Sequence, residues 1–122
     1  IVAQRLIRTL CSACKAPHDP SPIELRLLGI LPEETYQIFK PVGCAACEHL
    51  GYKGRTSILE LLKFDAALDE LVTQRASLKV MTDHVRAAGF VTMAEDGLRR
   101  VREGITTIEE VGRVVDLTEL IL

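Results

Sequence analysis

The sequence is poor in aromatic residues, and its charges nearly balance. It has no tryptophan, only three phenylalanines and two tyrosines, and a net charge of -2, with a pI near 5.9. Proteins that bind nucleic acid need a clustered basic face for the phosphates and aromatic platforms for the bases. The composition therefore argues against a nucleic-acid-binding protein, including one built on a zinc ribbon such as cysteine-containing chains can form. We expect no nucleic-acid partner.

Two further absences narrow the chemistry. No glycine is followed by lysine, so the phosphate-binding loop GxxxxGK[ST] is missing from this chain. Neither a Ser-His-Asp set nor an HExxH motif is visible. The apolar runs are far shorter than the ~20 residues that cross a bilayer. We therefore predict no catalytic residue in this chain and no direct membrane insertion.

The length of 122 residues favours one small domain. The chain has no initiator methionine and is apolar from its first positions, Ile1 and Val2. Natural termini are seldom so apolar. We expect Ile1 to lie inside a secondary-structure element of a longer protein, of which this chain is a C-terminal fragment.

The only cysteines form two C-x-x-C pairs. Cys11 and Cys14 are separated by 29 residues from Cys44 and Cys47. Each pair can bind one metal ion through a tight turn, and two pairs complete the tetrahedron that Zn²⁺ accepts. Four sulfur ligands leave no position for water or substrate. The sequence therefore predicts a structural zinc site rather than a catalytic one.

Three other interpretations compete with zinc. Two disulfides suit a secreted domain, but the chain shows no signal peptide. A thioredoxin-like redox site needs one such pair near a βαβ unit, and here there are two pairs without that unit. Buried inert cysteines are common, but they would rarely fall into two matched pairs. Zinc remains the favoured interpretation.

Histidines and basic residues lie near the cysteine pairs in the sequence. His18 and His49 could replace a cysteine ligand, but four thiolates already satisfy the ion, and His84 is expected at the surface of a helix. The cations that flank the pairs can offset the thiolate charge; they are Arg8, Lys15, Lys40, Lys53 and Arg55. Alternatively, Arg5, Arg8 or Arg55 at the base of the insertion contacts a phosphate, a base edge or a neighbouring subunit.

Two strands are predicted to enclose the cysteine region. Residues 1–10 fit neither helical nor strand periodicity cleanly, and we assign them to a strand. Residues 55–64 are rich in Ile and Leu and favour a buried strand, after a turn at residues 51–54. If these strands pair, residues 11–54 form an insertion that the metal fastens at its base.

Capping signals predict the helices. A capping box at Ser21 with Pro22 and Glu24 begins a helix that ends at Gly29, whereas residues 36–39 fit a strand or a helical turn. Four more helices begin after Asp65, Ser77, Thr92 and Thr106 or Thr107. Because short amphipathic helices are unstable alone, we expect residues 65–122 to form a compact bundle with Leu78, Met81 and Val85 in its core. The predicted fold is α+β.

Several motifs resemble one protein family. They are Ala3-Gln-Arg-Leu-Ile-Arg-Thr-Leu-Cys11-x-x-Cys14, Gly43-Cys44-x-x-Cys47, Gly51-Tyr-Lys-Gly-Arg-Thr-Ser-Ile58-Leu-Glu60, Gly89-Phe-x-Thr-Met93, Asp96-Gly97-Leu98 and Gly104-Ile-Thr-Thr-Ile-Glu-Glu-Val111. In order and spacing they resemble the C-terminal region of type II secretion and type IV pilus assembly ATPases. The resemblance covers nearly the whole chain.

The resemblance implies a bacterial cytoplasmic ATPase that forms a homohexameric ring beneath inner-membrane platform proteins. The parent protein would bind ATP and Mg²⁺ upstream of this region, and the chain would reach the inner membrane only through partners. Residues 1–10 and 55–64 would be the final strands of the ATPase core, 11–54 a tetracysteine zinc-binding subdomain, and 65–122 a C-terminal helical subdomain. Arg5, Arg8 and Arg55 match positions that could contact nucleotide or a neighbouring subunit.

Two functions from other classes stay open on the residues alone. One is a stand-alone zinc-dependent interaction module, and the other is a nucleic-acid-binding zinc ribbon, which the acidic balance disfavours. A phosphate-binding loop upstream in the parent gene would favour the ATPase. Salt-sensitive binding to DNA or RNA would favour the ribbon.

Overall fold

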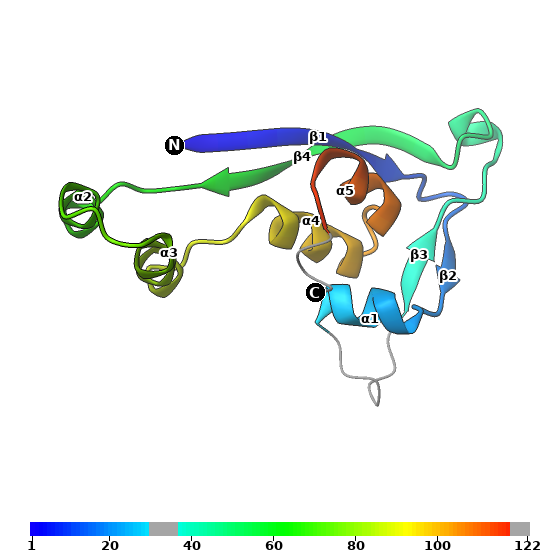
Figure 1. The fold of residues 1–122 in the computed structure, drawn as a ribbon. Helices are drawn as coiled ribbons and strands as arrows, with labels where there is room; N and C mark the ends of the chain where they lie inside the picture. The colour runs from blue at the N-terminus through cyan, green and yellow to red at the C-terminus, as the bar shows by residue number, and fades with distance from the viewer. Residues whose placement is uncertain (30–36, 118–122) are drawn as a thin grey trace.

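The chain folds around a long two-stranded ribbon with helices along one side (Figure 1). The computed structural model describes residues 1–29 and 37–117. Its elements are β1 (Val2–Leu10), β2 (Ala16–His18), α1 (Pro22–Leu28), β3 (Ile38–Lys40), a 3₁₀ turn η1 (Ala45–Cys47), β4 (Tyr52–Leu61), α2 (Ala66–Thr73), α3 (Leu78–Ala87), α4 (Met93–Arg102) and α5 (Ile108–Val114). The α+β class is confirmed.

Strands β1 and β4 pair antiparallel, as the sequence predicts. Val2 lies opposite Leu61 and Arg8 opposite Arg55, and an irregularity then brings Leu10 opposite Tyr52. The expected turn at residues 51–54 is wrong, because the ladder continues past the irregularity and β4 already begins at Tyr52. Strand β4 ends at Leu61, earlier than residue 64.

The segment between the two long strands forms its own small hairpin. Strand β2 pairs antiparallel with β3, with His18 opposite Ile38, and α1 lies at the far end of this hairpin (Figure 1). The expectation for residues 36–39 lies partly outside the described residues. Within the described residues, this segment is a strand, because Phe39 pairs with Pro17.

Local capping explains where the helices begin. At α1 the Ser21 hydroxyl accepts from the Glu24 backbone, the Glu24 carboxylate accepts from the Ser21 backbone, and Gly29 ends the helix at φ +70°. Side chains of Asp65, Ser77, Thr92 and Thr107 cap α2 to α5. Thr107 is therefore the cap of α5, rather than Thr106.

Helix α4 connects the ribbon to the rest of the core. Ile7, Ile58 and Met93 form one buried cluster between the ribbon and α4. A second cluster joins α1, β3, α4 and α5 through Leu28, Ile38, Leu98, Val101 and Val111. The helix can approach α5 closely because Gly97 lacks a side chain: an added Cβ would lie 2.6 Å from Val111 Cγ1.

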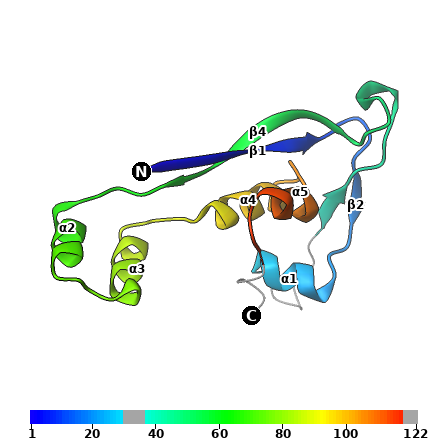
Figure 2. The ribbon, with the colours of Figure 1, turned by 45° about the horizontal axis from the view of Figure 1, so that its top comes forward.

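Helices α2 to α5 do not form the compact bundle expected for residues 65–122. Helices α2 and α3 pack against each other beyond one end of the ribbon, away from α4 and α5, in both views (Figures 1 and 2). The expected core position Leu78 is 78% exposed, and Met81 and Val85 are only partly buried. In α2 and α3 the only buried side chain is Leu68, so this pair buries little of its apolar surface; Val72, Leu78 and Val80 stay exposed. None of the helices within the described residues has the length and hydropathy of a membrane span.

Candidate metal centre

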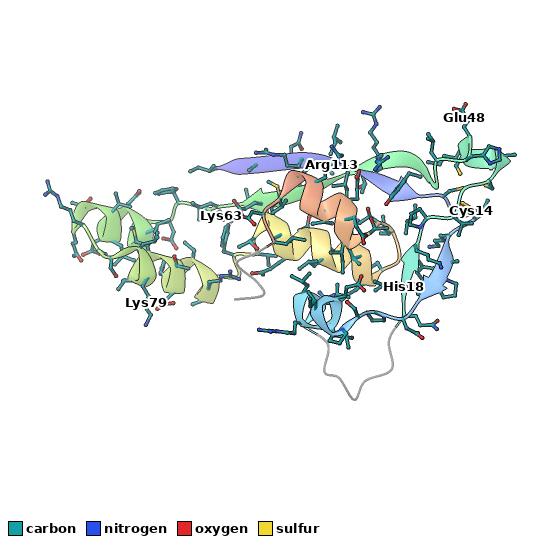
Figure 3. All side chains as sticks on the ribbon, turned by 45° about the vertical axis from the view of Figure 1, so that its right-hand side comes forward. Cys14, His18, Glu48, Lys63, Lys79 and Arg113 are labelled. Carbon is teal, nitrogen blue, oxygen red and sulfur yellow. The ribbon has the colours of Figure 1, made fainter. Side chains whose placement is uncertain are left out.

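The ribbon brings the two cysteine pairs together. Cys11 follows the last residue of β1, Cys44 precedes the 3₁₀ turn η1, and Cys47 is the last residue of that turn, which leads towards β4. The Cys11 amide donates to the Gly51 carbonyl at 3.0 Å, so the two pairs share a backbone connection. Sulfur atoms gather at this end of the molecule, beside the labelled Cys14 (Figure 3).

The four sulfurs lie at distances that suit one zinc ion. All four Sγ atoms are within 4.8 Å of one another, and three of the pairs, Cys11–Cys44, Cys14–Cys47 and Cys44–Cys47, are 3.8 Å apart. A tetrahedron with Zn–S bonds of about 2.3 Å has edges of about 3.8 Å. A disulfide needs about 2.05 Å, and all four cysteines are free thiols here.

Backbone amides point at the sulfurs. Gly43 N–H donates to Cys14 Sγ at 3.3 Å, and the amides of Cys44 and Gly51 donate to Cys47 Sγ, each at 3.2 Å. Burial opposes ionisation of Cys47, but these amides and the adjacent thiols lower its pKa to about 6. Burial outweighs the Gly43 amide at Cys14 and raises its pKa to about 11. The Cys47 sulfur is thus ready to bind metal as a thiolate at neutral pH, whereas Cys14 has to lose its proton on binding.

A glycine shapes the second pair. Gly51 has φ +83°, and an added Cβ would lie only 2.4 Å from Pro41 Cβ. A side chain there would push the segment before Cys44 away from Gly51, whose amide bonds Cys47. Backbone conformation is thus part of the site, beyond the four cysteines.

The histidines lie outside the sulfur cluster. His18 pairs with Glu24 at 3.3 Å, and His49 contributes its backbone amide to the Cys44 carbonyl at 2.8 Å. His84 is partly buried and pairs with Asp65 at 3.1 Å. Among the described residues, the four cysteines alone form a group with metal-ligand spacing.

Two of the cations near the cysteines in sequence, Lys15 and Arg8, have other partners. Lys15 donates to the Gly104 carbonyl at 2.9 Å and lies over the Phe39 ring. Arg8 binds the Glu110 carboxylate and stacks on Tyr52, with the guanidinium carbon 4.3 Å from the ring centre. Neither side chain therefore serves chiefly to offset thiolate charge.

The three predicted arginines do not form one group. Arg8 and Arg55 line the same surface pocket, together with Arg113. Arg5 does not line that pocket, and its side chain bonds the neighbouring Gln4 carbonyl at 3.0 Å. Hydrogen bonding to Glu110 raises the pKa of Arg8 above its ordinary value.

Sequence reasoning missed the role of Glu110. Its position in α5 fits a capping box, but the carboxylate, which is 2% exposed, accepts from both Arg8 and Arg113. Arg8 is 102 residues away in the sequence. A local motif could reveal the cap, whereas only the folded chain reveals the ion pair.

Comparison with known proteins places the chain in a family. The model of the family described as type II/IV secretion system protein matches residues 1–113. The type II secretion system ATPase E of Vibrio cholerae is 43% identical over 114 residues, covering 93% of this chain and 22% of the relative. The type IV pilus assembly ATPase PilB of Pseudomonas aeruginosa is 39% identical over 117 residues, covering 93% of this chain and 20% of the relative. The chain spans only about a fifth of the length of these relatives. It belongs to the type II/IV secretion system protein family.

Proposed function

We propose that this chain is the C-terminal zinc-binding and helical part of an ATPase that powers type II protein secretion or type IV pilus assembly. The main observation behind this proposal is that four thiols lie within 4.8 Å of one another in a chain that matches the family over residues 1–113. The names of the relatives support both branches, secretion and pilus assembly. The part of the protein that precedes this chain would bind ATP and Mg²⁺.

In this proposal Cys11, Cys14, Cys44 and Cys47 hold one structural zinc ion. The spacing of the sulfurs and the amides that point at them support the assignment. With four sulfur ligands the ion supplies cross-linking and no reactive position. The four side chains fix the base of the β2–β3 hairpin and of α1 relative to the ribbon.

The proposed protein works in the cytoplasm as a homohexamer and reaches the inner membrane through platform proteins. In it, residues 1–10 and 55–64 are the final strands of the ATPase core, residues 11–54 are a zinc-binding subdomain that docks on a neighbour or platform protein, and residues 65–122 are a helical subdomain that transmits movement of the core. Arg5, Arg8 and Arg55 are candidates for contact with nucleotide or a neighbouring subunit.

Replacing the insertion tests this function. In the complete protein that carries this chain, residues 12–46 are exchanged for a short turn, and ATP hydrolysis, hexamer formation, platform binding and secretion are measured. We expect hydrolysis by the purified complete protein, and loss of hexamer formation or platform binding in the variant. If the variant kept assembly, platform binding and secretion, the docking role of the insertion would be wrong.

A matched variant separates the metal from the loop. The double substitution Cys44→Ser and Cys47→Ser keeps the length of the insertion but removes two ligands. We expect it to lose zinc and to show the same assembly defect as the turn replacement. An unimpaired double variant would mean that the metal does not shape the docking element.

A further inference from the structure

Three guanidinium groups surround one surface pocket beside β1. Arg8 from β1, Arg55 from β4 and Arg113 from α5 line it, with Leu6 and Ile7 beside them, and its volume is about 570 Å³. The three arginines come from elements far apart in the sequence. Figure 3 places Arg113 next to β1, away from the cysteine end of the molecule.

Two of these arginines are held in fixed orientations. Both oxygens of the buried Glu110 carboxylate accept from Arg8 and from Arg113, over distances of 2.9 to 3.2 Å. In each guanidinium, Nε and Nη2 bind Glu110, so Nη1 remains for another acceptor. Two more contacts hold Arg8 in place. Its guanidinium stacks on the Tyr52 ring, and the Thr106 hydroxyl donates a 2.8 Å hydrogen bond to the Arg8 carbonyl. Arginines held in this way lose little conformational entropy when they bind an anion.

The third arginine has no internal acceptor. Arg55 stands directly opposite Arg8 in the antiparallel ladder, and like charges at such positions destabilise a sheet. The Arg55 side chain forms no hydrogen bond or ion pair with any residue in the described part of the chain. Among the described residues that line the pocket there are three guanidinium charges and no carboxylate, and the one carboxylate bound to these arginines in the described part of the chain is that of Glu110.

We propose that the pocket between Arg8, Arg55 and Arg113 binds a phosphate group. A phosphate monoester carries a charge of about -1.5 to -2 near pH 7 and has three acceptor oxygens, which matches the surplus charge and the open donors. A carboxylate carries one charge and would leave part of the repulsion in place. Inorganic phosphate and the phosphates of a nucleotide share this chemistry.

This inference gives a ligand class to the arginine contact that the proposed function includes, and it replaces Arg5 by Arg113. The inference rests on the proposed function only for the idea that these arginines contact a ligand, because phosphate binding by this chain needs no ATP hydrolysis. The chain contains no GxxxxGK[ST] loop, so phosphate binding measured on this chain cannot come from such a loop. Either proposal can therefore fail without the other.

The test is a titration of the 122-residue chain with inorganic phosphate, acetate and ATP at constant ionic strength. Calorimetry gives the affinity, and nuclear magnetic resonance follows the Arg Nε–H signals. The binding variant is Arg55→Gln, since the Arg55 side chain has no partner to lose among residues 1–29 and 37–117. The matched control is Lys79→Gln, which removes one positive charge from the exposed face of α3 at the other end of the molecule (Figure 3).

We expect phosphate and ATP to bind the chain and to shift the Arg55 Nε–H signal, and acetate to do neither. Arg55→Gln should bind phosphate roughly tenfold more weakly, because it loses one charge-assisted contact, whereas Lys79→Gln should bind like the unchanged chain. Binding of phosphate but not ATP would mean that the site takes the free ion. Equal binding of acetate and phosphate, or an unchanged affinity in Arg55→Gln, would overturn the proposal.

Discussion

At the scale of single residues, Glu110 is the most consequential buried group. Burial opposes its ionisation, but hydrogen bonds from Arg113 and Arg8 lower its pKa to about 2, from an ordinary 4.5. Because the folded-state pKa is the lower one, the carboxylate stabilises the fold above about pH 4.5. This contribution is lost as the pH falls towards 2.

Glu110→Gln should therefore remove a pH-dependent part of the stability. We expect a loss of about 2 to 3 kcal/mol at pH 7, a value reduced for screening because Arg8 and Arg113 are half exposed. Between pH 5 and pH 2 the variant should lose less stability than the unchanged chain. Urea unfolding at several pH values measures both. The control is Glu109→Gln, at an exposed residue one position earlier, which should behave like the unchanged chain. If all three proteins showed the same dependence of unfolding free energy on pH, the ion pair would be refuted.

Two glycines with positive φ provide a second comparison at this scale. Gly29→Ala meets no atom within 4 Å, and it should cost about 1 kcal/mol for the left-handed conformation alone. Gly51→Ala has the same conformational cost and also a contact of 2.4 Å with Pro41, so we expect about 2 to 4 kcal/mol. Only Gly51→Ala should also weaken zinc affinity in a chelator competition. Equal effects of both variants would show that Gly51 does not shape the site.

At the scale of elements, local signals predicted the helices well. The caps at Ser21, Asp65, Ser77 and Thr92 depend on residues within one turn, which the sequence shows directly. The start of β4 was missed, because Tyr52 enters the strand through its pairing with the distant Leu10. The bundle was also wrong, since periodicity shows that a helix has an apolar face without showing what covers that face.

The α2–α3 pair should open independently of the ribbon. It buries only Leu68, whereas α4 buries five residues, and local opening becomes easier where few apolar contacts are buried. In hydrogen exchange measured by mass spectrometry, amides of α2 and α3 should exchange much faster than those of β1, β4 and α4. Leu68→Ala should speed exchange in α2 and α3 alone, by removing about 2 to 3 kcal/mol of packing.

The control for this prediction is Leu78→Ala, at a side chain that is 78% exposed. It should leave the exchange of both helices nearly unchanged. Uniform protection of all five helices, or faster exchange in α4 after Leu68→Ala, would mean that the helices form one cooperative unit.

At the scale of the whole molecule, the ribbon spans the distance between two peripheral parts. The cysteine cluster, marked by the labelled Cys14, lies at one end (Figure 3), α2 and α3 lie beyond the other end, and α4 and α5 pack between them (Figure 1). The sequence predicted the four cysteines as one group because their spacing is a metal-ligand pattern. It could not predict the Arg8–Glu110 pair or the pocket beside it, because those contacts join residues from opposite ends of the chain.

We propose that one zinc ion fastens the β2–β3 hairpin and α1 to the ribbon. Structural zinc contributes on the order of 10 to 16 kcal/mol of apparent binding free energy in small peptides, comparable to the whole net stability of a domain. Its removal should therefore unfold the β2–β3 hairpin, whereas the contacts between the ribbon, α4 and α5 do not involve the ion.

Native mass spectrometry and hydrogen exchange of the chain, each before and after chelation, test the zinc site. We expect one zinc ion per chain before chelation. After chelation, β2, β3 and η1 should lose protection from exchange, while β1, β4 and α4 should stay protected. A metal-free chain with an unchanged exchange pattern after chelation would contradict this proposal.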